Sequence, residues 1–284
     1  GIVYILYLKI DERLNESKNI QSKTQIIKIL LDLVRFYKVA EFYDSDYVFT
    51  LERKDGDIIA SINCLDASKF LLKTIKEKTY GCLFFSATLY PINYYRKMLT
   101  ESEGNFVQID SPFEQEHLHL INVDNVSTRY RDRTNSIETI ISTIKILANS
   151  KVGNYIVFFP SYIYLEMVKK EIEKQALDFE LIIQKPDFTL QEREDVINLF
   201  HQNDITQVAF FVMGGMFSEG IDYLGDMLSG VIVVGVGLPM FGGYNNIVKE
   251  HFDEKTGQGF DFAYTYPGFA KVIQAVGRVI RTET

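Results

Sequence analysis

Three polar side chains share one face of a helix that the sequence predicts near its end. Gln274, Arg278 and Arg281 are separated by four and three residues, so on a helix they point the same way, and valines form the opposite side. A planar guanidinium matches phosphate oxygens and keeps its charge, so paired arginines suit a polyphosphate. A solvated face carrying two ordinary arginines is the alternative.

A glycine-rich loop follows the apolar run 208–212. Its side chains Ser218, Glu219 and Asp222 could hold a ribose hydroxyl or orient an arginine, and its glycines, Gly220 among them, let a ligand approach the backbone. Ligands of doubly wound sheets bind beyond the carboxyl ends of strands, where this loop is expected. A structural turn with a capping aspartate is the alternative.

A third candidate is the junction where the predicted strand 156–159 runs into Pro160, Ser161 and Tyr162. Ser161 is a typical helix N-cap, and the N–H groups of a helix N-terminus bind phosphate, here that of a DNA backbone. Most junctions of this kind only start a helix, so the junction decides nothing by itself.

These segments lie where apolar strands and amphipathic helices alternate. Strands are expected at 117–123, 155–159, 179–183, 207–212 and 231–236. Two capping-box patterns, Asn135 with Glu138 and Thr189 with Glu192, mark helix starts. Such alternation indicates a parallel sheet covered by helices on both faces.

The first hundred residues follow another pattern: a helix over 24–43, a hairpin over 47–64 that turns at Asp55–Gly56, a helix over 67–78 and a strand over 82–85. The last strand is apolar on both faces. We therefore expect it to pair with the hairpin or to be covered by a second molecule, with Phe84 and Phe85 buried.

Composition narrows the class of protein. A chain of 284 residues with 46% hydrophobic residues can form a real core, and its apolar runs are far shorter than a membrane helix needs. Cys64 and Cys82 cannot build a disulfide framework or a four-cysteine metal site.

The formal net charge of −8 excludes a globally basic nucleic-acid-binding domain, so any contact with nucleic acid must be local. We expect a cytoplasmic protein without membrane contact.

Taken together and in order, these segments resemble the motifs of superfamily-two helicases of the XPD/DinG family. The sequence Ser-Ala-Thr-Leu at 86–89 resembles the third motif, 158–162 the fourth, 215–222 the fifth and 274–281 the sixth. The resemblance covers most of residues 60–284.

This resemblance implies a division of the chain. Residues 106–284 would be a RecA-like second helicase lobe, 46–105 the tail of a first lobe, and 1–45 the end of a helical arch. The expected fold class is therefore α/β, with a parallel sheet flanked by helices and an N-terminal appendage of helix and hairpin.

The resemblance also implies roles for particular residues. In the family two lobes clamp ATP, so Arg278 and Arg281 would be arginine fingers with Gln274 beside them. The residues implied to approach the nucleotide are Gly220, Asp222 and Glu219. Those implied to lie near single-stranded or forked DNA are Phe159, Ser161, Tyr162 and Ser218. Those implied to couple the lobes are Ser86, Ala87 and Thr88.

Two departures from the family pattern limit what this chain can do. No G-x-x-x-x-G-K-[ST] loop occurs, and neither Asp11–Glu12 nor Asp253–Glu254 is followed by Ala-His. ATP and Mg²⁺ would be bound mainly by a first lobe outside this sequence, where an iron–sulfur cluster could also lie, and the chain alone is expected to be inactive. The whole protein is expected to be an ATP-dependent DNA helicase that moves 5′ to 3′ in repair or replication. The alternative is a non-catalytic RecA-like adaptor for nucleic acid or protein, against which the paired arginines argue.

Overall fold

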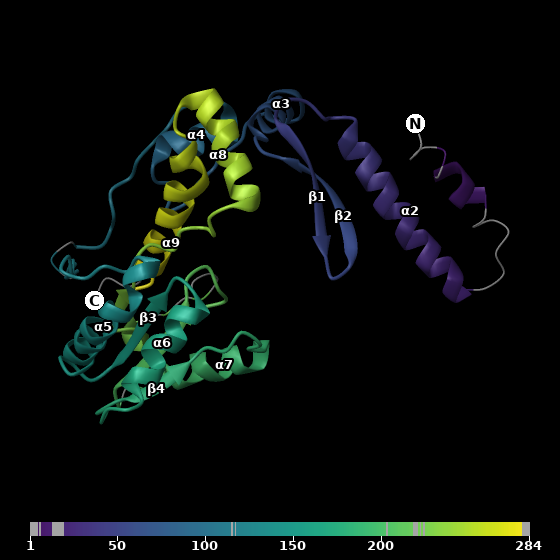
Figure 1. Cartoon of the computed structure of the whole chain (residues 1–284). Coiled ribbons are helices and arrows are strands. Elements are labelled where there is room, and N and C mark those ends of the chain that lie inside the picture. Colours follow the sequence, from purple (N-terminus) through teal and green to yellow (C-terminus); the bar gives the residue numbers. More distant parts are fainter. Residues whose placement is uncertain are drawn as a thin grey trace. The chain divides into compact units, whose positions relative to one another are not determined.

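A computed structural model describes residues 5, 7–12, 20–114, 116, 118–202, 204–217, 221, 223 and 225–279 (Figure 1). The chain divides into two compact units. Unit 1 comprises Gly1–Leu83 and Tyr95–Gly104, and unit 2 comprises Phe84–Tyr94 and Asn105–Thr284. Within the described residues, no helix is long and apolar enough to span a membrane.

Unit 2 is built on a parallel sheet with the strand order β4-β5-β3-β6. The strands are β3 (Asn154–Phe159), β4 (Glu180–Ile183), β5 (Gln207–Val212) and β6 (Gly230–Val233). Every side chain of the central strand β3 is buried, which explains its continuous apolar run. The α/β fold class is confirmed.

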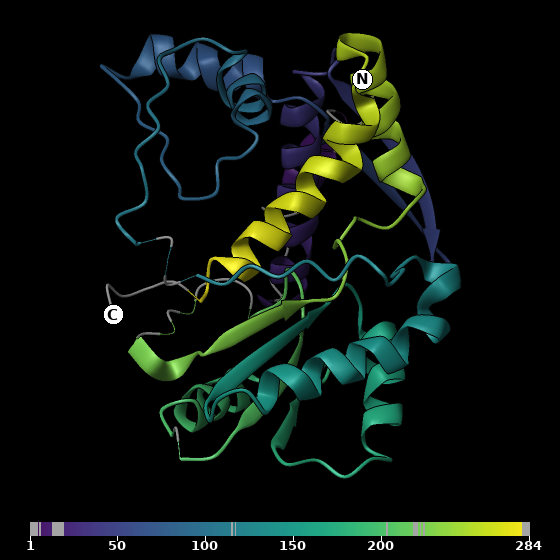
Figure 2. The same cartoon turned by 90° about the vertical axis from the view of Figure 1, so that its left-hand side faces the viewer.

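Helices cover both faces of this sheet (Figure 2). The helices of unit 2 are α5 (Arg133–Ala148), α6 (Tyr162–Ile172), α7 (Leu190–Leu199), α8 (Gly243–Thr256) and α9 (Tyr266–Val276), the last entered through a π-helical turn, Asp261–Thr265. Alternate residues of β3 point to opposite faces: Val157 packs with α5 and α6, whereas Phe158 packs with α7 and α9. The result is a three-layer arrangement that matches a RecA-like lobe.

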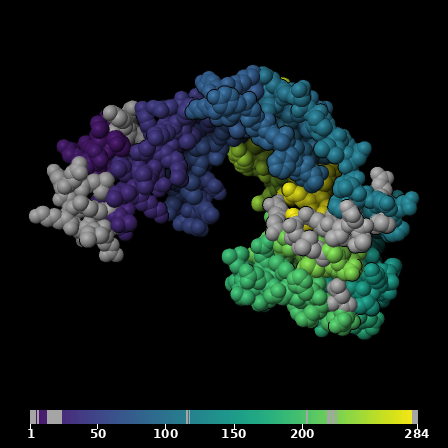
Figure 3. Space-filling model, turned by 180° about the vertical axis from the view of Figure 1, so that it is seen from behind, coloured from purple at the N-terminus to yellow at the C-terminus, as the bar shows by residue number. Residues whose placement is uncertain are grey.

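Four of the five strands predicted for this unit are confirmed, and β6 ends earlier than predicted because Gly235 adopts a left-handed backbone with φ 72°. The strand predicted over 117–123 is wrong for 118–123, which form no strand. The described residues between 105 and 123 are nearly all exposed, and they belong to the blue-to-teal surface in Figure 3. The capping box at Thr189 and Glu192 is present.

The capping box predicted at Asn135 and Glu138 is wrong. A 3-10 turn, Tyr130–Asp132, leads directly into α5, so the helix begins at Arg133 and Asn135 already lies inside its first turn. The N-cap residue Asp132 makes no side-chain cap. The turn thus starts the helix earlier than the sequence pattern suggested.

Unit 1 contains the predicted hairpin. Its elements are α2 (Ile20–Ala40), β1 (Tyr47–Lys54), β2 (Asp57–Cys64) and α3 (Ser68–Lys78), and α4 (Ile92–Thr100) spans the boundary between the units. Strand pairing runs from Tyr47 opposite Cys64 to Lys54 opposite Asp57. Asp55 and Gly56 both have positive φ, 52° and 91°, as a two-residue hairpin turn requires.

The segment 82–85 contradicts its prediction. It forms no strand, and Leu83, Phe84 and Phe85 are 80%, 41% and 84% exposed. Among the described residues, the hairpin is a sheet of two strands only, so 82–85 has no strand beside it. An isolated apolar run gains no backbone hydrogen bonds from an extended shape alone, and sheet formation needs a neighbour.

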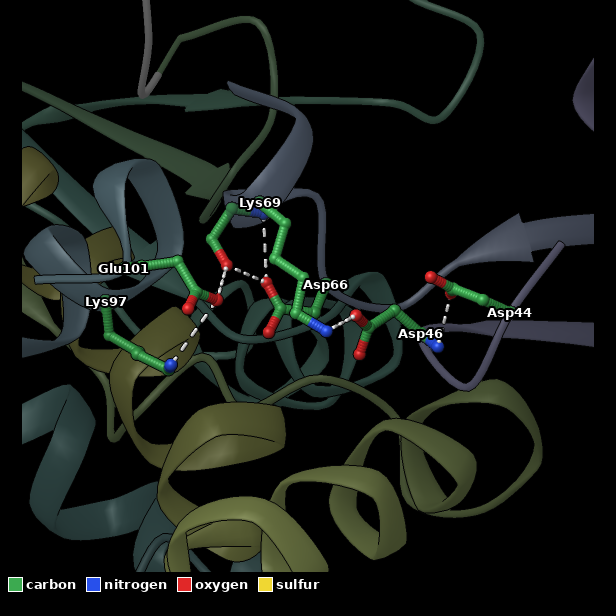
Figure 4. A network of polar contacts seen from close by, with 7 residues as sticks. Asp44, Asp46, Asp66, Lys69, Lys97 and Glu101 are labelled. Carbon is green, nitrogen blue, oxygen red and sulfur yellow. Dashed lines mark hydrogen bonds and ion pairs between the residues drawn. The ribbon is translucent and has the colours of Figure 1, made fainter. Parts of the chain in front are cut away.

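A polar network joins the base of the hairpin to α3 and α4 (Figure 4). The buried carboxylate of Asp46 lies 2.7 Å from the Lys69 ammonium, and its backbone oxygen accepts a 2.7 Å hydrogen bond from the Leu65 N–H. The Ser68 hydroxyl lies 2.6 Å from Asp66 Oδ1 and 2.8 Å from Glu101 Oε1. This hydroxyl has one hydrogen, so it donates to one of the two carboxylates at a time.

Candidate functional site

Three segments of unit 2 begin at the same edge of the sheet. Because β3, β5 and β6 are parallel, the segments that follow them emerge side by side at their carboxyl ends. These segments begin at Pro160, Met213 and Val234. This is the edge at which open α/β sheets bind ligands.

The glycine-rich loop begins as a tight turn at the end of β5. Gly214 has φ 72°, and the Gly215 N–H donates to the Val212 carbonyl at 3.1 Å. The buried side chain of Gln184, which follows β4, supports this turn, since its Oε1 accepts from the Val212 N–H at 2.9 Å. Sequence analysis missed Gln184. The signal available was a polar residue directly after an apolar strand.

Buried aromatic rings anchor the rest of the loop. Phe217 stacks on Phe211 of β5, with ring centroids 3.9 Å apart and an interplanar angle of 8°. Tyr223 is also buried, and its hydroxyl donates to the Phe217 carbonyl at 3.5 Å. Burial raises the pKa of Tyr223, although the charge of Arg278 acts to lower it, so the phenol stays neutral at physiological pH.

Four of the residues predicted for this loop, Ser218, Glu219, Gly220 and Asp222, lie outside the described residues, so their roles stay predictions.

Arg278 joins the last helix to this loop. It lies just past the end of α9, is 9% exposed, and its Nη1 donates to the Ile221 carbonyl at 2.6 Å. Gln274 is half-buried on α9, and Arg281 lies outside the described residues. The structure therefore brings Arg278 onto the backbone of the glycine-rich loop.

Lys271 is a cation within α9 that sequence analysis missed. A β-carbon on Gly214 would lie 3.4 Å from Lys271 Cε, and one on Gly237 would lie 3.4 Å from Lys271 Cδ. The lysine stem therefore runs along both glycines, which follow β5 and β6. The sequence spacing could have identified Lys271. It precedes Gln274 by three residues and Arg278 by seven, which places all three on one helix face.

The junction after β3 forms the predicted helix cap. Ser161 Oγ accepts from the Tyr164 N–H at 3.3 Å at the start of α6. Arg133 Nη1 lies 3.5 Å from the same hydroxyl oxygen, and the guanidinium lies 4.6 Å from the Tyr164 ring centroid and 5.2 Å from that of Tyr130. Tyr162 is half-buried, and burial raises its pKa.

Phe159 requires a correction. We expected it near single-stranded DNA, but its side chain is fully buried, with the rings of Tyr164 and Phe210 6.1 Å and 5.0 Å away. A ring in the core cannot stack on a base, so Phe159 packs the sheet against α5 and α6.

The residues of the Ser-Ala-Thr-Leu segment lie at the surface of unit 2. Ser86 Oγ accepts from the Thr88 N–H at 3.1 Å, which makes a local turn, and Ala87 between them is exposed. Downstream, Tyr90 lies 5.7 Å from the Phe269 ring of α9. Tyr94 likewise lies 5.0 Å from the Tyr266 ring, so the segment packs against α9, the helix that precedes Arg278.

Comparisons with known proteins find similarity to helicases. Residues 144–284 match a family described as the helicase C-terminal domain. The chain is 23% identical over 266 residues to the ATP-dependent DNA helicase CHL1 of Debaryomyces hansenii, an alignment that covers 86% of the chain and 32% of that protein. It is 24% identical over 248 residues to the ATP-dependent DNA helicase DinG of Photobacterium profundum, covering 81% of the chain and 34% of that protein. The chain thus spans about a third of the length of these relatives.

Two solved structures share the fold. A structure of an XPD helicase aligns with a TM-score of 0.60 and 21% identity over 90% of this chain and 44% of that one. A structure of apo XPD aligns with a TM-score of 0.60 and 18% identity over 95% of this chain and 54% of that one. Residues 144–284 therefore match the helicase C-terminal domain, and the chain is similar in sequence to CHL1 and DinG helicases and in fold to XPD structures.

Proposed function

We propose that this chain is the second lobe of an ATP-dependent DNA helicase and completes an ATP site whose phosphate loop lies elsewhere in the protein. The observation that carries the proposal is the hydrogen bond from Arg278 to the Ile221 carbonyl, which links the last helix to the glycine-rich loop at the carboxyl edge of the sheet. Relatives named as ATP-dependent DNA helicases support it, although the chain covers only about a third of each.

In this proposal Arg278 and Arg281 contact the γ-phosphate when the two lobes close, with Gln274 beside them. Arginine fingers accelerate phosphoryl transfer because they stabilise charge that develops in the transition state. Arg278 would then exchange its bond to the Ile221 carbonyl for a bond to a phosphate oxygen. Such an exchange would couple nucleotide binding to the conformation of the glycine-rich loop. This loop contains Ser218, Glu219, Gly220 and Asp222.

Nucleic acid would bind at the same edge of the sheet. Ser161 and Tyr162, at the start of α6, offer a hydroxyl and helix N–H groups to a backbone phosphate. The proposed substrate is single-stranded or forked DNA, and 5′ to 3′ movement in repair or replication extends the family resemblance. ATP and Mg²⁺ would bind mainly to the first lobe, and an iron–sulfur cluster, if the whole protein has one, would lie there too.

The proposal predicts that the purified chain binds single-stranded DNA but hydrolyses no ATP, because it lacks the phosphate-binding lysine and the acid that holds Mg²⁺. Phosphate release measured with and without single-stranded DNA should equal the enzyme-free rate. DNA-stimulated hydrolysis by this chain would contradict the proposal.

The alternative is a non-catalytic adaptor, which the buried position of Arg278 favours, since a buried guanidinium can be purely structural. The whole protein separates the two functions. If it binds single strands but never turns over ATP, the adaptor is correct.

A further inference from the structure

Two side chains at the carboxyl edge of the sheet carry positive charge that no described carboxylate neutralises. Neither Arg133 nor Lys271 has an ion pair among the described residues. Both lie at one edge of one sheet, and positive charge gathered at such an edge favours a ligand with negative charge.

The backbone shapes the position of Lys271. Its stem runs along Gly214 and Gly237, where β-carbons would each lie 3.4 Å from it, and its Nζ would lie 3.8 Å from a β-carbon at Gly214. Gly214 also needs its left-handed φ of 72° to make the turn. The two glycines therefore leave a channel for the stem and hold the ammonium at the end of β5.

The position of Arg133 is unfavourable without an anion. Its guanidinium lies at the start of α6, within 3.5 Å of the capping hydroxyl of Ser161, where the helix dipole already places partial positive charge. Rings of Tyr164 and Tyr130 hold it there. Its Nε is buried and donates no hydrogen bond within the described part of the chain.

We propose that Arg133 and Lys271 bind separate phosphates of one nucleic-acid single strand that crosses the carboxyl edge of the sheet. The inference rests on the proposed function and assigns it two residues. Arg133 stands at the end of β3 and Lys271 at the ends of β5 and β6, so the charges come from different elements rather than from one wrapped loop. Spaced cations suit an extended phosphate backbone, which needs no base-specific groups.

The test measures the affinity of the purified chain for a mixed-sequence single-stranded oligonucleotide over a range of salt concentrations. Each phosphate contact contributes about 0.7 to the slope of log affinity against log salt. Arg133→Met keeps a long side chain on the Tyr164 ring, and Lys271→Met keeps the stem along the glycines, so both remove charge with little loss of packing. We expect each variant to make the slope shallower by about 0.7, and the double variant by about 1.4.

Matched controls are Arg131→Met and Lys174→Met, which remove the same charges from exposed side chains that pair with Asp132 and Glu171. Their slopes should equal that of the parent, and thermal unfolding should show every variant folded. If the parent binds and the test variants match their controls, this inference fails and the proposed function stands. If the parent does not bind single strands, both fail. If the variants lose affinity for a fluorescent ATP analogue but keep the parental DNA slope, the phosphates belong to a nucleotide and the inference is wrong.

Discussion

Arg278 has to satisfy its charge in a nearly buried position, and it does so on the backbone of the glycine-rich loop. Its Nη1 donates to the Ile221 carbonyl at 2.6 Å, and its charge acts on the neighbouring Tyr223 phenol. A buried guanidinium is tolerated only where hydrogen bonds replace water. The side chain therefore holds the loop through its backbone, and the proposed finger role would require it to release that carbonyl and bind a phosphate instead.

In the whole protein, Arg278→Ala is expected to lower kcat by about 10³ or more while ATP affinity changes little, because the contact strengthens as charge develops. Arg278→Lys should have a kcat nearly as low as that of Arg278→Ala, since an ammonium lacks the planar, forked donors of a guanidinium. Steady-state kinetics with saturating single-stranded DNA measure this. Arg131→Ala, an exposed arginine, is the control, and a kcat for Arg278→Ala close to the parental value would exclude the finger role.

The two cysteines should differ in reactivity. Burial raises the pKa of the Cys64 thiol, which is half-buried beside Tyr47 in the hairpin, whereas Cys82 is exposed. A raised pKa means less thiolate at a given pH, so a thiol reagent at pH 8 should label Cys82 first. Mass spectrometry of the Cys64→Ser and Cys82→Ser variants assigns each labelling rate to one cysteine. Equal rates would show that the hairpin base opens freely.

At the scale of elements, the hairpin and α3 depend on the polar network at their junction. Asp46 is buried, and its ion-pair partner Lys69 extends from α3 with half of its side chain exposed. The pair ties the first residues of β1 to the helix that follows β2. Loss of the cation would leave a buried carboxylate short of a partner.

Lys69→Met is therefore expected to reduce the local stability of the hairpin by about 1–3 kcal/mol. Hydrogen exchange of the amides of β2 measures this, because it reports local opening. Lys73→Met, on the same helix but 70% exposed, should change nothing, and Asp46→Asn should restore part of the loss in Lys69→Met. Equal exchange in both lysine variants would contradict the prediction.

Elements whose partners lie within the chain were predictable from sequence. The hairpin follows from its turn residues at Asp55–Gly56, and the central strand β3 from its apolar run. The segment 82–85 has the same apolar character but no neighbouring strand, and local sequence cannot say whether a neighbour exists. Lys271 and Gln184 were missed for a related reason, since their roles depend on glycines and backbone atoms that only the folded sheet brings near them.

At the scale of the whole molecule, several highly exposed apolar side chains lie in segments that form no strand. Leu83 and Phe85 are 80% and 84% exposed, and Val107 and Ile109 are 77% and 87% exposed. Exposed apolar side chains in unpaired segments promote association between molecules.

Replacing Leu83 and Phe85 by serine should therefore lower the tendency of the isolated chain to self-associate without lowering its melting temperature, since neither side chain is buried. Light scattering over a concentration series, together with thermal unfolding, would show this. The control is Leu65→Ser, a buried leucine, which should lower the melting temperature. Unchanged self-association of the double variant would mean that other surfaces drive it.

The strand order of the sheet also fixes when its core can form. The central strand β3 comes first along the chain, yet both of its neighbours, β5 and β6, come later, with two helices and the strand β4 synthesised in between. Parallel pairing between segments so distant in sequence requires long loops to close. The entropy lost in closing them precedes the stabilising contacts, and this slows folding. During synthesis the backbone of β3 therefore has no strand neighbour until β5, and on its other side β6, has left the ribosome, so its sheet hydrogen bonds form late.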